Sequence, residues 1–149
     1  SLPLDAQAFA EDYFARLAEG AFLLDGAEAF LRALKALGRI YIVTNGASGT
    51  QNRRLKKSGI SAYADGVFIS EEIGCYKPSA AYADHVESHI PQYARARAVW
   101  IGDSLTSDFA CANSRGIDFI LYCPQGEKAG YTGLSARSYA EVLALIGGL

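Results

Sequence analysis

Apolar and polar residues follow two different spacings along this 149-residue chain, and the spacings alternate from about residue 26 onward. Short runs of β-branched and aromatic residues predict strands, whereas stretches in which apolar residues recur every three or four positions predict amphipathic helices. Strands that alternate with helices pair in parallel, and fully apolar runs such as 41–43 and 99–101 suit strands covered on both faces. We therefore expect an α/β fold with three layers, in which a Rossmann-like parallel sheet has helices on both faces.

The same spacings give approximate bounds for each element. Strands are predicted over 39–46, 66–70, 97–102 and 118–123, with a weaker fifth strand over 130–134. Helices are predicted over 4–20, 25–38, 48–59, 77–91, 104–116 and 138–146. Three of these helices begin with Asp or Ser followed three positions later by Glu or Gln, as in a capping box. The three pairs are Asp25 with Glu28, Ser48 with Gln51, and Ser138 with Glu141.

Composition narrows the classes of function. The formal charge is −2 and 20% of the residues are charged, so no strong positive field favours nucleic acid or an anionic membrane. No apolar run reaches the roughly 18 residues that a membrane-spanning helix needs. Cys75, Cys111 and Cys123 show no Cys-x-x-Cys spacing and are predicted to be buried, reduced thiols of a cytoplasmic protein. Small or metal-bound partners are therefore favoured.

Polar residues follow the predicted strands at their carboxyl ends, where parallel α/β sheets bind their ligands. These residues are Thr44, Asn45 and Gly46 after the first strand, Ser70 and Glu71 after the second, and Gly102, Asp103 and Ser104 after the third. The first group lies between a strand end and a helix start, where a hydroxyl and backbone amides form an anion site suited to phosphate. A simple polar turn is the alternative interpretation. The residues after all three strands are expected to share one rim of the sheet.

Two carboxylates, Asp103 and Asp108, lie five positions apart at the boundary between the third strand and the next helix. Asp103 follows a glycine that lets the backbone come close, and Asp108 lies about one helical turn further on. Oxygen ligands of this kind suit Mg²⁺, which takes one or two carboxylates and keeps several waters. Alternatively, Asp103 caps the helix and Asp108 is a solvated acid of its first turn.

Lys77 precedes Pro78 at the start of a predicted helix, where the helix dipole disfavours a cation. This placement indicates a negatively charged partner elsewhere, and a solvent-exposed lysine in a loop is the alternative. His85 and His89 lie one turn apart, but no third ligand is near and their stretch of helix is polar. A solvated helix face is the preferred interpretation of the two histidines.

A strand followed by Thr-Asn-Gly, a Lys-Pro that opens a helix, and a strand followed by Gly-Asp-Ser-x-x-x-Asp occur in this order. This order resembles the haloacid dehalogenase (HAD) superfamily of phosphohydrolases, and most closely its nucleotidase-like branch with a helical cap. The resemblance implies that Thr44 binds the transferring phosphoryl group, with help from Asn45 and Gly46 after it. It further implies that Lys77 neutralises phosphate charge, and that Asp103, supported by Asp108, holds Mg²⁺. A small phosphorylated substrate is the implied partner.

The chain departs from the family at the nucleophile. In the family, an Asp at the end of an apolar strand attacks phosphorus, and a second Asp two positions later protonates the leaving group. No aspartate of this chain has that arrangement. The resemblance therefore implies that residues 1–20 are a remnant of the helical cap and residues 21–149 are the HAD-like α/β core. The family's first, central strand and most of the cap are missing from this pattern.

The predicted helix over 4–20 carries an apolar stripe of Phe9, Tyr13, Phe14 and Leu17. Such a stripe usually packs against another element. If its partner belongs to the missing part of the cap, the stripe is exposed or self-associates.

A missing central strand would leave two apolar strands with unpaired edges. Either another polypeptide, such as an N-terminal fragment or a second copy of the chain, supplies the strand, or the two strands pair directly. We expect phosphate monoester hydrolysis, of phosphatase or nucleotidase type, from the full-length protein and no activity from this chain alone. Two alternatives stay open: a non-catalytic module that binds phosphate, metal or a partner, and, more weakly, a receiver-type signalling domain.

Overall fold

The computed structural model describes residues 5–126 and 128–149 of the chain. In these residues, parallel strands form two sheets. Strand β1 (Tyr41–Thr44) pairs with β2 (Gly66–Ile69), and the second sheet contains β3 (Val99–Gly102), β4 (Asp118–Tyr122) and β5 (Ser135–Ala136) in that order. The predicted α/β class with parallel strands is confirmed.

The fifth strand lies just after residues 130–134 rather than within them. Gly130 has a left-handed φ of 80°, and the amide of Tyr131 donates to Lys128 O, so this part of the chain turns. The Tyr131 ring then packs against Phe109 and Phe119, and the segment joins the sheet at its end, where Leu134 O accepts a hydrogen bond from Leu121 N of β4.

Helices connect the strands and flank them at both ends of the chain. They are α1 (Ala6–Glu19), α2 (Ala27–Leu37), α3 (Ser48–Ser58), α4 (Ser70–Ile73), α5 (Ala80–His89), α6 (Ala110–Asn113) and α7 (Tyr139–Ile146). Short 3₁₀ turns lie at Ile60–Tyr63 and Arg95–Arg97, and a π-helical turn over Leu105–Phe109 leads into α6. The six predicted helices are confirmed, and α4 is an additional single turn. None of the described helices is long and apolar enough to cross a membrane.

Of the three predicted capping boxes, the one at α7 is confirmed in part. Ser138 Oγ accepts a hydrogen bond of 3.2 Å from Glu141 N, but Glu141 Oε2 accepts from Arg137 N rather than from Ser138 N. The other two predictions are wrong. Helix α2 begins after Gly26, which has a left-handed φ of 79°. Helix α3 begins at Ser48 itself, and its first turn is capped from outside by the carboxylate of Glu71. Tertiary contacts and backbone geometry replace the local caps at these two positions.

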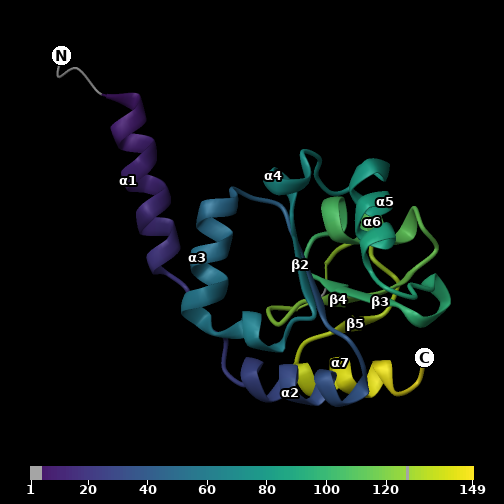
Figure 1. Cartoon of the computed structure of the whole chain (residues 1–149). Coiled ribbons are helices and arrows are strands. Elements are labelled where there is room, and N and C mark those ends of the chain that lie inside the picture. Colours follow the sequence, from purple (N-terminus) through teal and green to yellow (C-terminus); the bar gives the residue numbers. More distant parts are fainter. Residues whose placement is uncertain (1–4, 127) are drawn as a thin grey trace.

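Two helical layers enclose the strands (Figure 1). On one face, Tyr82 of α5 and Cys111 of α6 are buried together with Phe68 of β2. On the opposite face, Phe30 of α2 and Val142 of α7 pack in a cluster with residues of β3 and β4. The predicted three-layer arrangement with helices on both faces is therefore present.

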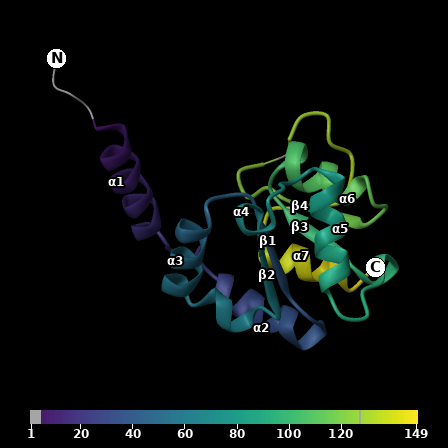
Figure 2. The same cartoon turned by 45° about the horizontal axis from the view of Figure 1, so that its top comes forward.

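The hydrogen-bond ladders are interrupted at the centre of the fold, and we call this interruption the gap between the two sheets. Within the described residues, no hydrogen-bond ladder joins β1 to β3, although Figure 2 shows both sheets as neighbours in one body. Direct pairing of these two strands, one of the two outcomes considered above, is not what the structure shows. Strands β1 and β3 therefore each keep one edge without a ladder, which is a strong site for strand addition.

Helix α1 extends away from the body of the molecule and contacts α3 (Figures 1 and 2). Its Phe9 and Tyr13 stack on each other while 62% and 52% of their surfaces are exposed. These two residues thus follow the exposed outcome considered for the apolar stripe. The side chains of Phe14 and Leu17 lie outside the described residues. The assignment of residues 1–20 to a cap stays a prediction.

Candidate active site

A cavity of about 350 Å³ opens between the carboxyl ends of β1 and β3. Five of the six residues predicted from the sequence line this cavity, namely Thr44, Asn45, Lys77, Asp103 and Asp108. The sixth, Gly46, directly follows Asn45 but is not part of the lining. Parallel strands direct their carboxyl ends to the same edge, so three loops that are far apart in sequence converge here.

Lys77 is buried, with 7% of its side chain exposed, although it lies in a loop between two helices. Its ammonium group donates hydrogen bonds to Val43 O (2.9 Å) and to Asp108 Oδ1 (2.7 Å). A buried charge is tolerated when it is paired and hydrogen-bonded. Asp108 is therefore the negative partner that the position of Lys77 indicated, and the alternative of a solvent-exposed lysine is wrong.

Both carboxylate oxygens of Asp108 accept hydrogen bonds inside the chain. Oδ1 accepts from Lys77, and Oδ2 accepts from the backbone amide of Ser104 (3.2 Å). The π-helical turn turns this side chain back toward β3, because the amides of Asp108 and Phe109 both donate to Ser104 O. A Cβ atom on Gly102 would lie 2.5 Å from Asp108 Oδ2. Glycine is therefore required beside this carboxylate.

Asp103 lies at the rim of the cavity, and its side chain is exposed. Within the described part of the chain, its carboxylate has no hydrogen-bond or ion-pair partner. The following helical turn is capped by Ser104, whose Oγ accepts from Ser107 N (3.2 Å), so the alternative role of Asp103 as that cap is wrong. An exposed carboxylate in a polar cavity fits a direct ligand of Mg²⁺. Asp108, which is already engaged through both oxygens, fits a supporting position behind it.

The three residues after β1 differ in how far they are already engaged. The Thr44 hydroxyl has only a long contact to Asn45 O (3.5 Å) among the described residues and is open to a ligand. The Asn45 side chain bonds to the backbone of Lys77, and the Gly46 amide donates to Ser70 Oγ (2.9 Å). Of this group, the hydroxyl is therefore the donor most available to phosphate.

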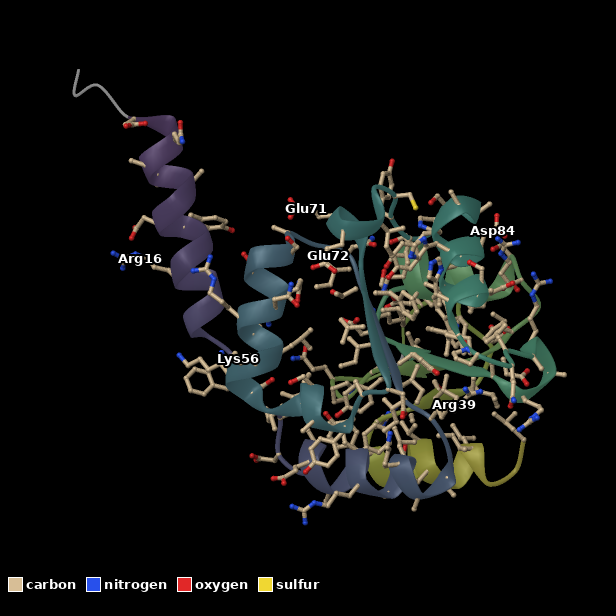
Figure 3. The ribbon with its side chains drawn as sticks, viewed as in Figure 1. Arg16, Arg39, Lys56, Glu71, Glu72 and Asp84 are labelled. Carbon is tan, nitrogen blue, oxygen red and sulfur yellow. The ribbon has the colours of Figure 1, made fainter. Side chains whose placement is uncertain are left out.

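The amino end of α3, where an anion site was expected, receives a carboxylate of the chain itself. Glu71 of α4 accepts a hydrogen bond of 2.7 Å from Ser48 N, and the next residue, Glu72, accepts one of 2.8 Å from Asn52 Nδ2. Figure 3 shows the two labelled glutamates between α3 and α4. The hydrogen bond from the Ser48 amide lowers the pKa of Glu71. This helix end thus has its negative partner before any ligand arrives.

Sequence reasoning missed the contacts of three residues in this region. Ser70 and Glu71 were expected on the rim as residues after the second strand, but their contacts with Gly46 and Ser48 depend on the single turn α4 and could not be predicted. Lys128, from the loop before β5, donates a hydrogen bond to Asp103 O at the cavity rim. No local signal marks Lys128, since its loop reads as an ordinary polar turn.

The lesser candidates do not form a second site. His85 and His89 stack with ring centroids 3.9 Å apart, and no group of three metal-ligating residues occurs among the described residues. Cys111 and Cys123 are buried free thiols, as predicted, whereas Cys75 is half-buried. Burial raises the pKa of Cys111, which keeps it in the thiol form.

Comparison with known proteins identifies the family of the chain. A family model described as haloacid dehalogenase-like hydrolase matches residues 3–114. This chain belongs to the haloacid dehalogenase-like hydrolase family. The resemblance noted in the sequence is thereby confirmed at the level of the family.

Two similar proteins and one solved structure illustrate the relationship. The HAD-hydrolase YfnB of Bacillus subtilis is 38% identical over 114 residues, which are 76% of this chain and 48% of YfnB. The pyrimidine 5′-nucleotidase PynA of Streptococcus pneumoniae is 36% identical over 121 residues, which are 80% of this chain and 51% of PynA. A crystal structure of YfnB bound to magnesium superposes on this chain with a TM-score of 0.90 at 32% sequence identity. The match covers 96% of this chain and 64% of the YfnB chain in that structure. The chain spans about half the length of the curated relatives that it matches.

Proposed function

We propose that this chain provides the part of a phosphate monoester hydrolase that holds phosphate and Mg²⁺. The observation that supports the proposal most directly is the cavity between β1 and β3, where Thr44, Lys77 and Asp103 meet. Phosphoryl transfer depends mainly on positioning and on electrostatic stabilisation of the phosphoryl oxygens. A hydroxyl donor, a fixed ammonium and a carboxylate for a divalent cation are groups of the kind that this reaction needs.

Each residue has a separate task in this proposal. Thr44 donates its hydroxyl proton to a phosphoryl oxygen, and Lys77 places a positive charge beside the same group. Asp108 keeps Lys77 in place and limits its movement, because the two side chains are 2.7 Å apart. Asp103, supported by Asp108, would hold the magnesium ion, which when bound neutralises phosphoryl charge. Lys77, Asp103 and Asp108 together carry one net negative charge, so a divalent cation is needed before a phosphate dianion is attracted.

The nucleophile comes, in our proposal, from a polypeptide segment outside these 149 residues. The sequence contains no Asp-x-Asp pair. The edges of β1 and β3 that face each other carry no ladder in the described residues, so an extended segment could add between them and pair with both. An aspartate at the carboxyl end of such a strand would enter the cavity beside Thr44 and Asp103. An N-terminal fragment is the preferred source, and a second copy of the chain is the other.

The proposed substrate is a small phosphate monoester. The names of two relatives, a pyrimidine 5′-nucleotidase and a ribulose-1,5-bisphosphate 5-phosphatase, both describe removal of a phosphate from a small molecule. We extend only this common feature to the present chain. A cytoplasmic location is part of the same proposal.

The test compares the chain alone with a completed enzyme. The purified, mass-verified 149-residue chain is assayed with p-nitrophenyl phosphate and a panel of nucleoside monophosphates in Mg²⁺, and no turnover is expected. A chimera that joins the chain to the part of YfnB that it does not match is expected to hydrolyse phosphate monoesters when Mg²⁺ is present. Asp103→Asn in the chimera should lower kcat/KM at least about 100-fold. Asp118 is an exposed aspartate at the start of β4, and Asp118→Asn should leave kcat/KM unchanged.

Turnover by the chain alone, or turnover by the chimera that is independent of Asp103, would contradict the proposal. A folded chimera without activity would favour the second candidate, a non-catalytic binding module. The observation that favours this second candidate is the absence of an Asp-x-Asp pair from the sequence.

A further inference from the structure

We infer that Asn45 is a positioning residue that fixes the backbone from which the Lys77 side chain extends. The inference rests on the proposed function, because its consequence is a cation held at a phosphate site. The sequence predicts Asn45 as a direct phosphate contact. Its side chain instead has two partners on the main chain of Lys77.

The side-chain amide of Asn45 makes a reciprocal pair of hydrogen bonds with one residue. Lys77 N donates to Asn45 Oδ1 (2.9 Å), and Asn45 Nδ2 donates to Lys77 O (3.0 Å). Two adjacent antiparallel strands exchange hydrogen bonds in the same reciprocal way. Asn45 directly follows β1, so the end of this strand holds the loop between α4 and α5 without a strand in that loop.

Lys77 is fixed at both ends by this arrangement. No helix or strand includes its backbone, so Asn45 takes over the pairing that a regular element would otherwise supply. At the far end of the side chain, the ammonium donates to Val43 O and Asp108 Oδ1. Lys77 is thus held by three residues, Val43, Asn45 and Asp108. Two of them, Val43 and Asn45, lie at the carboxyl end of β1. A shift of Lys77 relative to the end of β1 would therefore break both contacts at once.

The type of residue at position 45 matters because one of the two hydrogen bonds needs a side-chain acceptor and the other needs a side-chain donor. A primary amide offers an acceptor and a donor in one plane. Asp would keep the acceptor for Lys77 N but would place a carboxylate oxygen against Lys77 O, and Ala would lose both bonds. The second N–H of Asn45 Nδ2 stays available to a ligand, so an experiment has to separate positioning of Lys77 from contact with phosphate.

Acylation of lysines separates the two roles because it reports on Lys77 itself. The 149-residue chain and its variants are treated with acetic anhydride, and mass spectrometry gives the rate at each lysine, with the exposed Lys56 as internal reference (Figure 3). In Asn45→Ala, the rate at Lys77 relative to Lys56 is expected to rise about tenfold, because two hydrogen bonds that keep the loop closed are lost. Asn45→Asp should also raise the rate, because it keeps the bond from Lys77 N but replaces the bond to Lys77 O by a repulsive contact between two oxygens.

Asn52→Ala is the matched control, since Asn52 also uses its side-chain amide but donates to Glu72 Oε1, away from the cavity. It should leave the rate at Lys77 unchanged. A folded Asn45→Ala chain with unchanged Lys77 reactivity would overturn the inference, and so would an equal rise in Asn52→Ala. If Asn45→Ala does not fold, Asn45→Asp decides by the same criteria. Acylation needs no turnover, so the inference and the proposed function can fail separately.

Discussion

The inner wall and the rim of the cavity differ in how their polar side chains are engaged. On the inner wall, Lys77 and Asp108 are buried, and their charged groups bond to each other and to main-chain groups. On the rim, Thr44 has one long contact, and within the described residues the Asp103 carboxylate has none. The inner wall is thus assembled by the chain alone, whereas the rim has capacity left for ligands. The two regions should respond differently to substitution.

The largest effect is expected from breaking the buried pair. Asp108→Asn leaves the Lys77 ammonium buried without a compensating charge, so the free energy of unfolding should fall by about 3–5 kcal/mol. Urea denaturation at pH 7 measures this change. Glu28→Gln is a suitable control because Glu28 pairs with Arg32 on the exposed surface of α2, where the loss should be much smaller. Equal losses in the two variants would remove the distinction between the inner wall and the surface.

A smaller loss is expected when the space beside Asp108 is filled. Gly102→Ala places a Cβ atom against the Asp108 carboxylate and should cost about 1–3 kcal/mol in unfolding free energy. In Gly38→Ala, the new Cβ meets nothing within 4 Å, so this variant is the control. The added Cβ would also lie 2.6 Å from Asp108 Cβ, so the cost of Gly102→Ala should shrink when Asp108 is already replaced by Gly. Additive losses in the double variant would show that the clash lies elsewhere.

The rim should behave in the opposite way. Asp103→Asn should leave the unfolding free energy unchanged, because the Asp103 carboxylate supports no contact of the fold in the described residues. It should weaken binding of a divalent or lanthanide cation at least about tenfold. Tb³⁺ luminescence sensitised by Trp100, which lines the cavity and is the one Trp of the chain, measures this affinity. Unchanged Tb³⁺ affinity would exclude Asp103 as a ligand.

The smallest effect is expected at the amino end of α3. The Ser48 amide lowers the pKa of Glu71 below its ordinary value of 4.5, so the charged form stabilises the folded chain. This contribution is complete above pH 4.5 and is lost as the pH falls through the lowered pKa. Glu71→Gln should therefore reduce the thermal midpoint slightly at pH 7, and the difference from the unsubstituted chain should vanish in more acidic solution. A difference that grows toward acid would contradict this assignment.

The sequence was sufficient to predict those site residues that directly follow a strand. Apolar runs locate β1 and β3, and polar residues directly after them line the cavity, as Thr44 and Asp103 do. The sequence was insufficient to predict contacts between elements that lie far apart along the chain. The partner of Lys77 could be inferred only as an anion, because the pairing with Asp108 depends on the π-helical turn. Likewise, Ser48 looked like a cap, although Glu71 of another helix supplies it.

The gap between the sheets shows a further limit of local patterns. Residues 41–43 and 99–101 form strands, as predicted, but all six residues are half-buried rather than fully covered. Periodicity does not state which strands are neighbours, so direct pairing of β1 and β3 could not be decided in advance. In the structure each strand pairs on one side only. Whatever fills the gap would also complete the cavity, because Val43, Thr44, Ile101 and Gly102 line it.

The central claim is that one cavity, between the ends of β1 and β3, receives phosphate together with magnesium. Backbone amide chemical shifts of the ¹⁵N-labelled 149-residue chain, recorded during titration with inorganic phosphate in the presence of Mg²⁺, test this claim most directly. The account predicts shifts concentrated at residues 43–46, 77 and 102–108, and their loss in Asp103→Asn. Shifts that concentrate elsewhere on the molecule, or that persist unchanged in Asp103→Asn, would contradict it.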